Sequence, residues 1–148
     1  MGIPVAASAL YRLLSDSYSS WLKQPLVDPV LTDEQAARWL YEEASFGLLA
    51  HDTRDDPLFI YGNVFAQRCF EYAWDELMQL PSRLSAPPQQ VQGRREFLEQ
   101  VSKQGFAIGY RGLRIGKSKR TFWINDGIVW QLVDQAGVLR GQAALFRT

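Results

Sequence analysis

The stretch DPLFIYGN, residues 56–63, is followed by FEYAWDEL at residues 70–77, and together they decide the fold. The apolar run at 58–61 lies between Asp-Pro and Gly-Asn pairs, which bound a short β-strand. Asn63 is a favourable helix N-cap, and apolar residues follow it at helical spacing through Ala73. The sequence therefore predicts a strand that passes directly into a helix at Asn63, with a further short turn at 74–78.

Upstream of this stretch the sequence predicts two helices and another strand. An amphipathic helix is indicated by apolar residues three and four positions apart, and Pro25 stops it. These apolar residues are Leu10, Leu13, Leu14, Tyr18, Trp21 and Leu22. Thr32 and Gln35 have capping-box spacing and begin a second helix. The apolar run at 46–50 predicts a strand, which the polar residues 51–57 separate from the strand at 58–61.

Downstream, the sequence predicts a loop, a helix and a sheet. Residues 80–88 contain three prolines, which lack the amide donor, and predict a loop over the surface. A helix at 94–104 has apolar residues on one face, and Gly105 closes it as a left-handed cap. Three strands follow, at 106–115, 122–132 and 138–147. A change of alternation at Gly112 predicts a bulge in the first of them.

The order of these elements predicts an α+β fold with two parts that form one globular unit. Residues 1–44 are an N-terminal helical lead-in, and residues 45–148 form the sheet and its helices. That second part resembles the PAS fold, a five-stranded antiparallel sheet with helices on one face that enclose a pocket. Glu71 stands where many PAS domains have glycine.

The resemblance is closest to the MEKHLA domain, a PAS-like module at the carboxyl end of plant class III homeodomain-leucine-zipper proteins and alone in bacteria and algae. The runs that carry it are LAHD at 49–52, DP at 56–57, YGN at 61–63, WDEL at 74–77, LPSRLS at 80–85, QGF at 104–106 and GQAA at 141–144. The sequence contains no homeodomain, zipper or lipid-binding domain, so it is similar to the standalone form. The resemblance implies a sensor or interaction module, and the DNA binding of the plant proteins does not carry over.

The composition is that of an ordinary globular protein without net charge. Hydrophobic residues make up 47% of the 148 residues, which excludes a disordered chain. Sixteen basic residues balance sixteen acidic ones, so no overall field attracts nucleic acid or an anionic membrane. No stretch approaches the ~18 apolar residues of a membrane span. The single cysteine, Cys69, fits a reducing compartment, and we expect a cytoplasmic protein without membrane or nucleic-acid contacts.

His51, the only histidine, has two interpretations. It lies beside Asp52 and near Asp55, so a metal-binding, proton-sensing or even catalytic role is conceivable. A second nitrogen ligand is absent from the sequence, and we favour a hydrogen-bonding residue that organises the following turn. The helix at 94–104 contains no histidine to bind a haem iron, so we do not expect haem.

Cys69 also has two interpretations, a photochemical thiol or a small buried hydrophobe. It shares a helix face with Ala66 and Phe70, which favours the second. The light-sensing flavin branch of PAS domains carries an Asn-Cys-Arg-Phe run that is missing here. Gln142 directly follows Gly141, and this spacing would turn it to the other face of the sheet from the glutamine of those domains. We expect no covalent flavin, and the cofactor remains unknown.

The hairpin after residue 110 carries five positive charges and no acidic residue. These are Arg111, Arg114, Lys117, Lys119 and Arg120. They suit either an acidic or phosphate-bearing partner, or solvated charges that protect an edge strand from aggregation. We favour the second interpretation.

Aromatic residues concentrate in the segments that would enclose a PAS pocket, and they give the strongest functional indication. Core packing accounts for most of them, but the polar ends of Tyr and Trp suit a pocket for an aromatic or heterocyclic ligand. The predicted ligand-binding residues are Tyr61, Asn63, Phe70, Trp74, Tyr110, Trp123 and Trp130. We therefore expect a sensory or interaction module for a small molecule or a protein partner, without catalysis or a metal. The alternatives are a small enzyme and a ligand-free dimerisation module.

The apolar stripe of the first helix is wider than one helix needs by itself. It predicts either a homodimer through this helix or packing of the helix on its own sheet. The sequence leaves these two alternatives equally open.

Overall fold

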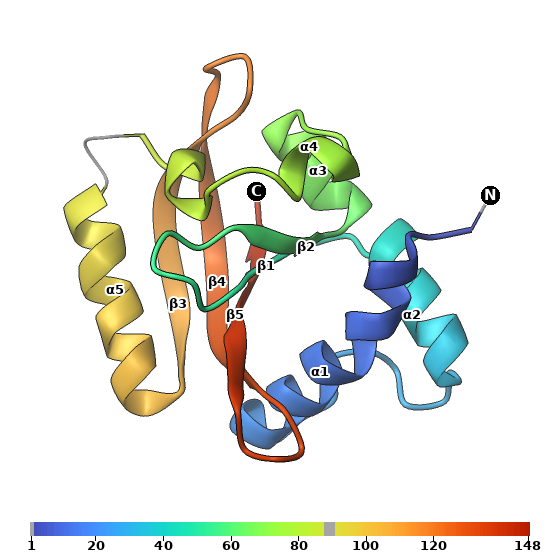
Figure 1. Ribbon diagram of the computed structural model, residues 1–148. Coiled ribbons are helices and arrows are strands. Elements are labelled where there is room, and N and C mark those ends of the chain that lie inside the picture. The colour runs from blue at the N-terminus through green and yellow to red at the C-terminus, as the bar shows by residue number, and fades with distance from the viewer. Residues whose placement is uncertain (1, 88–90) are drawn as a thin grey trace.

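Five strands form one antiparallel sheet in the order β2-β1-β5-β4-β3. In the computed structural model, which describes residues 2–87 and 91–148, β1 pairs with β2 on one side and with β5 on the other (Figure 1). The strands are β1 (Gly47–His51), β2 (Phe59–Gly62), β3 (Phe106–Ile115), β4 (Thr121–Val133) and β5 (Leu139–Arg147). The predicted five-stranded antiparallel sheet is therefore confirmed.

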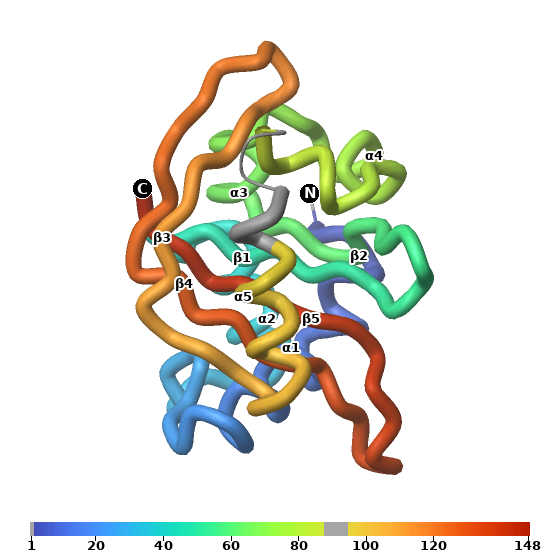
Figure 2. The backbone as a smooth tube through the Cα atoms, turned by 90° about the vertical axis from the view of Figure 1, so that its left-hand side faces the viewer, coloured from blue at the N-terminus to red at the C-terminus, as the bar shows by residue number. Residues whose placement is uncertain are grey.

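Helices cover both faces of this sheet. They are α1 (Val5–Leu22), α2 (Asp33–Glu42), α3 (Val64–Phe70), α4 (Trp74–Leu77), the 3₁₀-helix η1 (Ser82–Ser85) and α5 (Val91–Gln104). Figure 2 shows α5 in front of the sheet, with α1 and α2 behind it. We call the face toward α5 the inner face and the face toward α1 the outer face. None of the helices described is long and apolar enough to cross a membrane.

The outer face is covered by the two N-terminal helices. Leu14 of α1 is completely buried in a core that includes Leu48 and Trp130 of the sheet. Ser17 Oγ donates to the Val133 carbonyl at 3.1 Å and accepts from the Val133 amide at 3.0 Å. Trp21 Nε1 donates to the Gln131 carbonyl at 3.0 Å. The apolar stripe of α1 therefore packs on its own sheet, which is the second of the two alternatives.

The inner face carries two smaller hydrophobic clusters. One joins Leu49, Ile124 and Phe146 of the sheet to Phe70 of α3 and Leu77 of α4. The other places Val101 of α5 against the neighbouring strands β3 and β4. Helix α5 lies over β3, and the short helices lie over the other end of the sheet (Figure 1).

Asn63 joins three elements at the point where β2 passes into α3. Its Oδ1 accepts from the Ala66 amide at 3.1 Å, which is the predicted N-cap, and from the Leu48 amide at 3.0 Å. Its Nδ2 donates to the Leu40 carbonyl at 3.1 Å and to the Phe46 carbonyl at 3.0 Å. Asn63 is completely buried, so this one amide group fixes α2, β1 and α3 relative to one another.

One segment differs from the sequence-based expectation, and one predicted strand contains an irregularity. The predicted surface loop contains η1, and Ser82, Ser85 and Ala86 are buried; residues 88–90 lie outside the described residues. Strand β4 runs without interruption through Asn125-Asp126-Gly127, where Asp126 adopts a left-handed conformation with φ 53°. The register of β4 shifts at that point, so the strand contains a bulge there.

Candidate functional site

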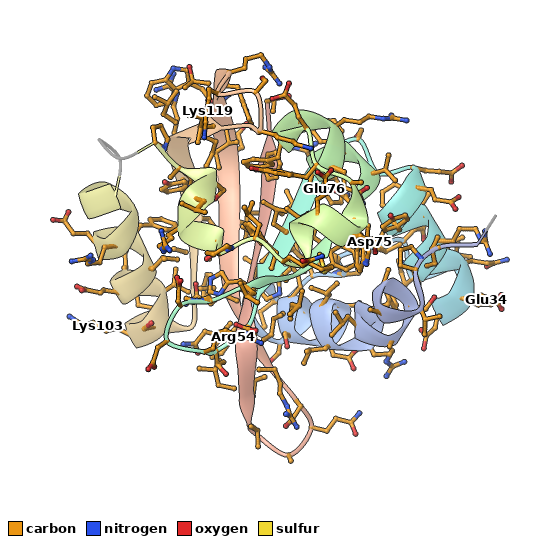
Figure 3. All side chains as sticks on the ribbon, turned by 45° about the horizontal axis from the view of Figure 1, so that its top comes forward. Glu34, Arg54, Asp75, Glu76, Lys103 and Lys119 are labelled. Carbon is orange, nitrogen blue, oxygen red and sulfur yellow. The ribbon has the colours of Figure 1, made fainter. Side chains whose placement is uncertain are left out.

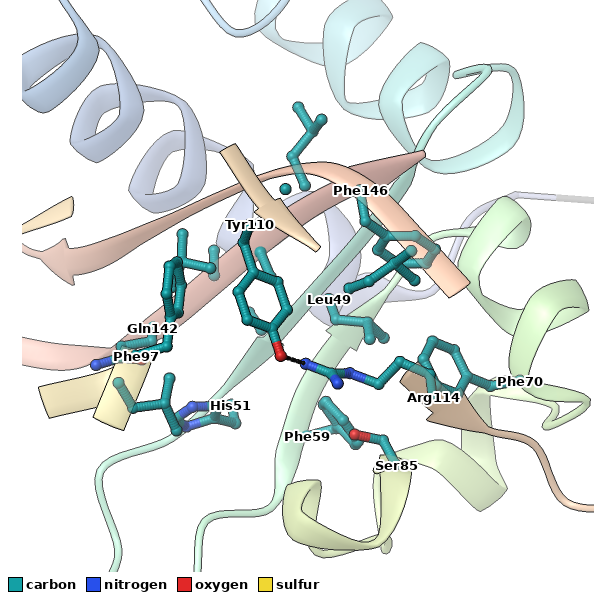
Figure 4. Close-up of a pocket in the computed structure, with 18 residues that line it drawn as sticks. Leu49, His51, Phe59, Phe70, Ser85, Phe97, Tyr110, Arg114, Gln142 and Phe146 are labelled. Carbon is teal, nitrogen blue, oxygen red and sulfur yellow. Dashed lines mark hydrogen bonds between the residues drawn. The ribbon is translucent and has the colours of Figure 1, made fainter. Parts of the chain in front are cut away.

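A cavity of about 70 Å³ lies on the inner face, between the sheet and the helices α5 and η1 (Figure 4). It falls in the space between the two inner clusters. Its lining residues are Leu49, Ala50, His51, Phe59, Phe70, Ser85, Phe97, Leu98, Tyr110, Arg114, Ile124, Gly127, Val129, Gln142, Ala143, Ala144, Leu145 and Phe146. The walls are mostly apolar, with a few polar side chains, which is the usual composition of a small-molecule site.

Arg114 is the only arginine, lysine, aspartate or glutamate among the lining residues, and it is 8% exposed. Its Nη1 donates to the Leu113 carbonyl at 2.8 Å, and its Nη2 donates to the Tyr110 hydroxyl at 2.9 Å (Figure 4). The guanidinium carbon lies 5.2 Å from the centre of the Tyr110 ring. No acidic residue lines the cavity, and none of the described carboxylates forms an ion pair with Arg114. The expectation that Arg114 is a solvated edge-strand charge is therefore wrong.

Gln142 presents a second polar group to the cavity. Its Oε1 is buried and has no hydrogen-bond donor within the described part of the chain. Ala144 and Phe146 also line the cavity, and residues two apart in a strand share a face, so Gln142 points to the inner face with them. The expectation that its spacing from Gly141 turns it away from the pocket side is wrong. A buried acceptor without a donor is uncommon and calls for a partner group.

His51 lies at the end of β1, on the wall of the same cavity. Its Nδ1 lies 2.9 Å from the carbonyl oxygen of Asp52, so that nitrogen carries the proton. The following turn is organised by Asp52, whose Oδ1 accepts from the amides of Arg54 at 3.3 Å and Leu58 at 3.1 Å. The described residues contain no group of three His, Cys, Asp or Glu side chains that could hold a metal ion.

The family of the protein follows from comparison of its sequence. A sequence profile of the MEKHLA domain matches residues 8–148. The chain belongs to the MEKHLA domain family. A search of curated proteins gave no match.

Solved structures similar to this MEKHLA domain are PAS and light-oxygen-voltage domains. The PAS domain of a protein from Colwellia psychrerythraea is 14% identical, with a TM-score of 0.62 over 72% of this chain and 88% of that one. An RNA-binding light-oxygen-voltage receptor is 18% identical, with a TM-score of 0.66 over 83% of this chain and 35% of the receptor. A light-oxygen-voltage domain studied with a flavin analogue is 17% identical, with a TM-score of 0.58 over 68% and 75%. At these identities the likeness shows the fold alone.

The cavity of the MEKHLA domain does not fit a flavin in the shape it has here. An engineered protein cavity of about 150 Å³ binds one benzene ring. The cavity of about 70 Å³ is roughly half that size, whereas a flavin has three fused rings. Cys69 is not part of the lining; it is half-buried at the edge of the inner cluster, and burial raises the pKa of its thiol.

The seven ligand residues predicted from the sequence do not lie together in the structure. Phe70 and Tyr110 line the cavity together. Tyr61, Trp74 and Trp130 belong to the outer-face core, where the rings of Tyr61 and Trp74 lie 5.9 Å apart, and burial raises the pKa of the Tyr61 phenol. Asn63 is the buried hydrogen-bonding residue described above, and Trp123 is 44% exposed. Sequence reasoning thus missed Arg114, Gln142, Ser85 and Phe97, although the strand alternation of Ala144 and Phe146 gave a usable signal for Gln142.

The side chains of three of the four remaining charged residues of the β3–β4 hairpin also have partners within the domain. Arg111 donates to Asn125 Oδ1 at 3.1 Å, and its guanidinium carbon lies 4.0 Å from the Trp123 ring centre. Lys117 pairs with Glu76 of α4, and Arg120 donates to the Cys69 carbonyl at 3.1 Å. Figure 3 shows this end of the molecule, with Lys119 and Glu76 labelled. These contacts tie the hairpin to the short helices, so it is not a basic patch of unengaged side chains.

Proposed function

We propose that this MEKHLA domain is a sensory module that binds a small molecule in the inner-face cavity and acts through contact with a protein partner. The observation that carries the proposal is a cavity in which apolar walls and a few polar side chains converge from the sheet, α5 and η1. The PAS-like fold supports it, because similar domains include light-oxygen-voltage receptors. The proposal assigns no catalytic residue, and the Ser85 hydroxyl in the lining donates to the Ser82 carbonyl at 2.7 Å.

Helix α5 is the element best placed to respond to a ligand. Phe97 and Leu98 of α5 line the cavity, and the Phe97 and Tyr110 rings lie 4.3 Å apart. The end of the helix is held firmly, because Val101 is fully buried and the Gly105 carbonyl accepts from the Gln131 amide at 2.9 Å. A ligand that separates Phe97 from Tyr110 therefore tilts the start of α5 about its fixed end. Of the aromatic residues predicted from the sequence, Phe70 and Tyr110 contact the ligand in this proposal.

A second candidate function is a protein-interaction module without a ligand. It is supported by the small volume of the cavity, about 70 Å³. In that case the polar groups of the cavity stabilise the fold and do not recognise a ligand.

Native mass spectrometry of freshly purified protein, followed by a thermal-shift screen of small molecules, tests the proposal. We expect a bound mass or a stabilising compound, and we expect Ala144→Leu to abolish it by filling the cavity. Ala136→Leu is the matched control, because Ala136 lies in the exposed turn between β4 and β5. A protein that binds no compound, or a bound compound that both variants retain, would favour the second candidate.

The contact with a partner is a separate part of the proposal. The stripe of α1 packs on its own sheet, so a homodimer through that stripe would need the helix to leave the sheet. We therefore expect the partner, or a second copy, to bind another surface. Light scattering at several concentrations, with pull-down experiments, tests this; a strict monomer without any partner would contradict it.

The half-buried Cys69 and the absence of a second cysteine support action in a reducing compartment.

A further inference from the structure

The candidate cavity contains one buried cation and no acidic side chain. We propose that its ligand is a small organic monocarboxylate and that Arg114 binds the carboxylate group. This inference rests on the proposed function, because it names the ligand class of the same cavity. It is carried by the charge, burial and hydrogen bonding of Arg114, and by the shape of the walls around it.

Arg114 is buried without a counter-charge. Seven ion pairs join other residues of the described chain, and their arginine and lysine side chains are 50% exposed or more. Within the described part of the chain, the acceptors of Arg114, which is 8% exposed, are the Leu113 carbonyl and the Tyr110 hydroxyl. A guanidinium that is removed from water is strongly stabilised by an anion at hydrogen-bonding distance. The unbalanced charge therefore points to an anionic ligand.

The guanidinium still has donors for such a ligand. Arginine has five N–H groups, and the bonds to the Leu113 carbonyl and the Tyr110 hydroxyl use one on Nη1 and one on Nη2. The Nε–H group and one further N–H on each Nη are left. A carboxylate accepts two parallel hydrogen bonds from such a pair, an arrangement that an ammonium group does not offer. Tyr110 holds the guanidinium in place and is therefore a positioning residue for this contact.

The walls favour a monocarboxylate over phosphate or sulfate. One guanidinium neutralises one negative charge, and a dianion would leave a second charge among Leu49, Phe59 and Phe70. These apolar side chains suit the short hydrocarbon tail of an organic acid. The volume of about 70 Å³ limits that tail to a few carbon atoms, because about 150 Å³ holds a benzene ring. The buried Gln142 Oε1 lacks a donor, so a hydroxyl group on the acid would strengthen binding.

The test uses the full chain with propionate and lactate as probes and propionamide as the uncharged control, at constant ionic strength. Calorimetry and thermal unfolding are expected to show binding of both acids, tighter binding of lactate, and none of the amide. Arg114→Met should lower the affinity by about tenfold to a hundredfold, since hydrogen bonds to charged groups are of that strength. Arg111→Met, on the exposed side of the same strand, should leave the affinity unchanged.

Several results would overturn the inference. These are equal binding of propionate and propionamide, tighter binding of phosphate than of propionate, or unchanged affinity in Arg114→Met. If that variant does not fold, Arg114→Lys replaces it, since it keeps the charge but loses the paired donors; unchanged affinity there has the same meaning. A neutral ligand lost in Ala144→Leu but kept in Arg114→Met would refute the inference and leave the proposed function standing. A protein that binds none of these probes would refute the inference, and the proposed function would be refuted as well only if native mass spectrometry and the thermal-shift screen also found no ligand.

Discussion

Replacement of Asn63 by alanine should destabilise the domain more than any exposed substitution. The four hydrogen bonds of its amide group measure 3.0 to 3.1 Å, and all four partners are backbone groups of the buried junction. Each of the four backbone groups left without a partner destabilises the fold by about 1–3 kcal/mol. Part of this loss is offset, because the variant no longer buries a polar amide side chain. We expect a loss of about 4–6 kcal/mol, which is a large share of the ~5–15 kcal/mol that stabilises a domain of this kind.

Urea unfolding followed by tryptophan fluorescence and circular dichroism measures this loss. Thr32→Ala is the matched control, because Thr32 is an N-cap at the exposed start of α2, where the loss is about 1 kcal/mol. Asn63→Asp keeps the two acceptor bonds but turns a carboxylate toward the carbonyl oxygens of Leu40 and Phe46, so it should also be strongly destabilised. If Asn63→Ala costs no more than Thr32→Ala, the junction does not depend on this amide group and the reasoning fails.

Three further predictions concern other parts of the fold. Leu14→Glu should unfold the domain, as seen by circular dichroism, because the carboxylate has no partner in the outer core; a folded variant would show that α1 is not held on the sheet. Lys23→Gly should raise the free energy of unfolding by about 1 kcal/mol, since Lys23 ends α1 at φ 61°, whereas Lys103→Gly inside α5 should lower it by a similar amount; a loss in both variants would contradict this. The pKa of Asp134 is lowered, first by the hydrogen bond from the Val138 amide and then by a hydrogen bond from Arg140. Its contribution to the stability of the fold is therefore fully present above the ordinary aspartate pKa. That contribution is lost as the pH falls through the lowered pKa. The stability difference between the wild type and Asp134→Asn should therefore shrink in urea titrations as acid is added below pH ~4, and a constant difference would refute the assignment.

The local signals in the sequence predicted the elements well. The apolar run before Asn63 and the cap at Asn63 itself are properties of neighbouring residues, and the structure has both where the sequence placed them. The same holds for the capping box at Thr32 and the left-handed cap at Gly105, with φ 89°. These features depend on backbone chemistry within a few residues, so distant packing does not change them.

The sequence did not predict which face of the sheet each strand side chain points to. The shift of register near Asp126 turns Ile124 to the inner face but Trp130 to the outer one, although both stand at even positions. A shift of one residue reverses every side chain that follows, and the sequence shows only that some irregularity occurs there. Arg114 was missed for a related reason. A charged residue in an edge strand is normally solvated, whereas Arg114 is buried and lines the cavity together with residues distant in the sequence, such as Phe70 and Ser85.

Glu71 gives the opposite case, in which a departure from the PAS pattern has a local explanation. It ends α3 in a left-handed conformation, φ 67°, which is a conformation that glycine adopts readily. Its carboxylate accepts hydrogen bonds from Ser118 Oγ at 2.6 Å and from the Ser118 amide at 3.2 Å, which also lower its pKa. Glu71 thus adopts a backbone conformation that is unfavourable for a residue other than glycine, and its side chain connects α3 to the β3–β4 hairpin.

The position of β5 between β1 and β4 has a consequence for how the chain is made. A ribosome synthesises β5 after the other four strands, yet the sheet order leaves β1 and β4 without direct pairing. Until β5 emerges, the growing chain holds two separate strand pairs, and each exposes an open edge to its neighbours. Domains generally begin to fold from the amino-terminal side during synthesis, but this sheet is complete only when its last strand, β5, pairs with β1 and β4. A nascent chain that stalls before Leu139 is therefore expected to need protection from a chaperone.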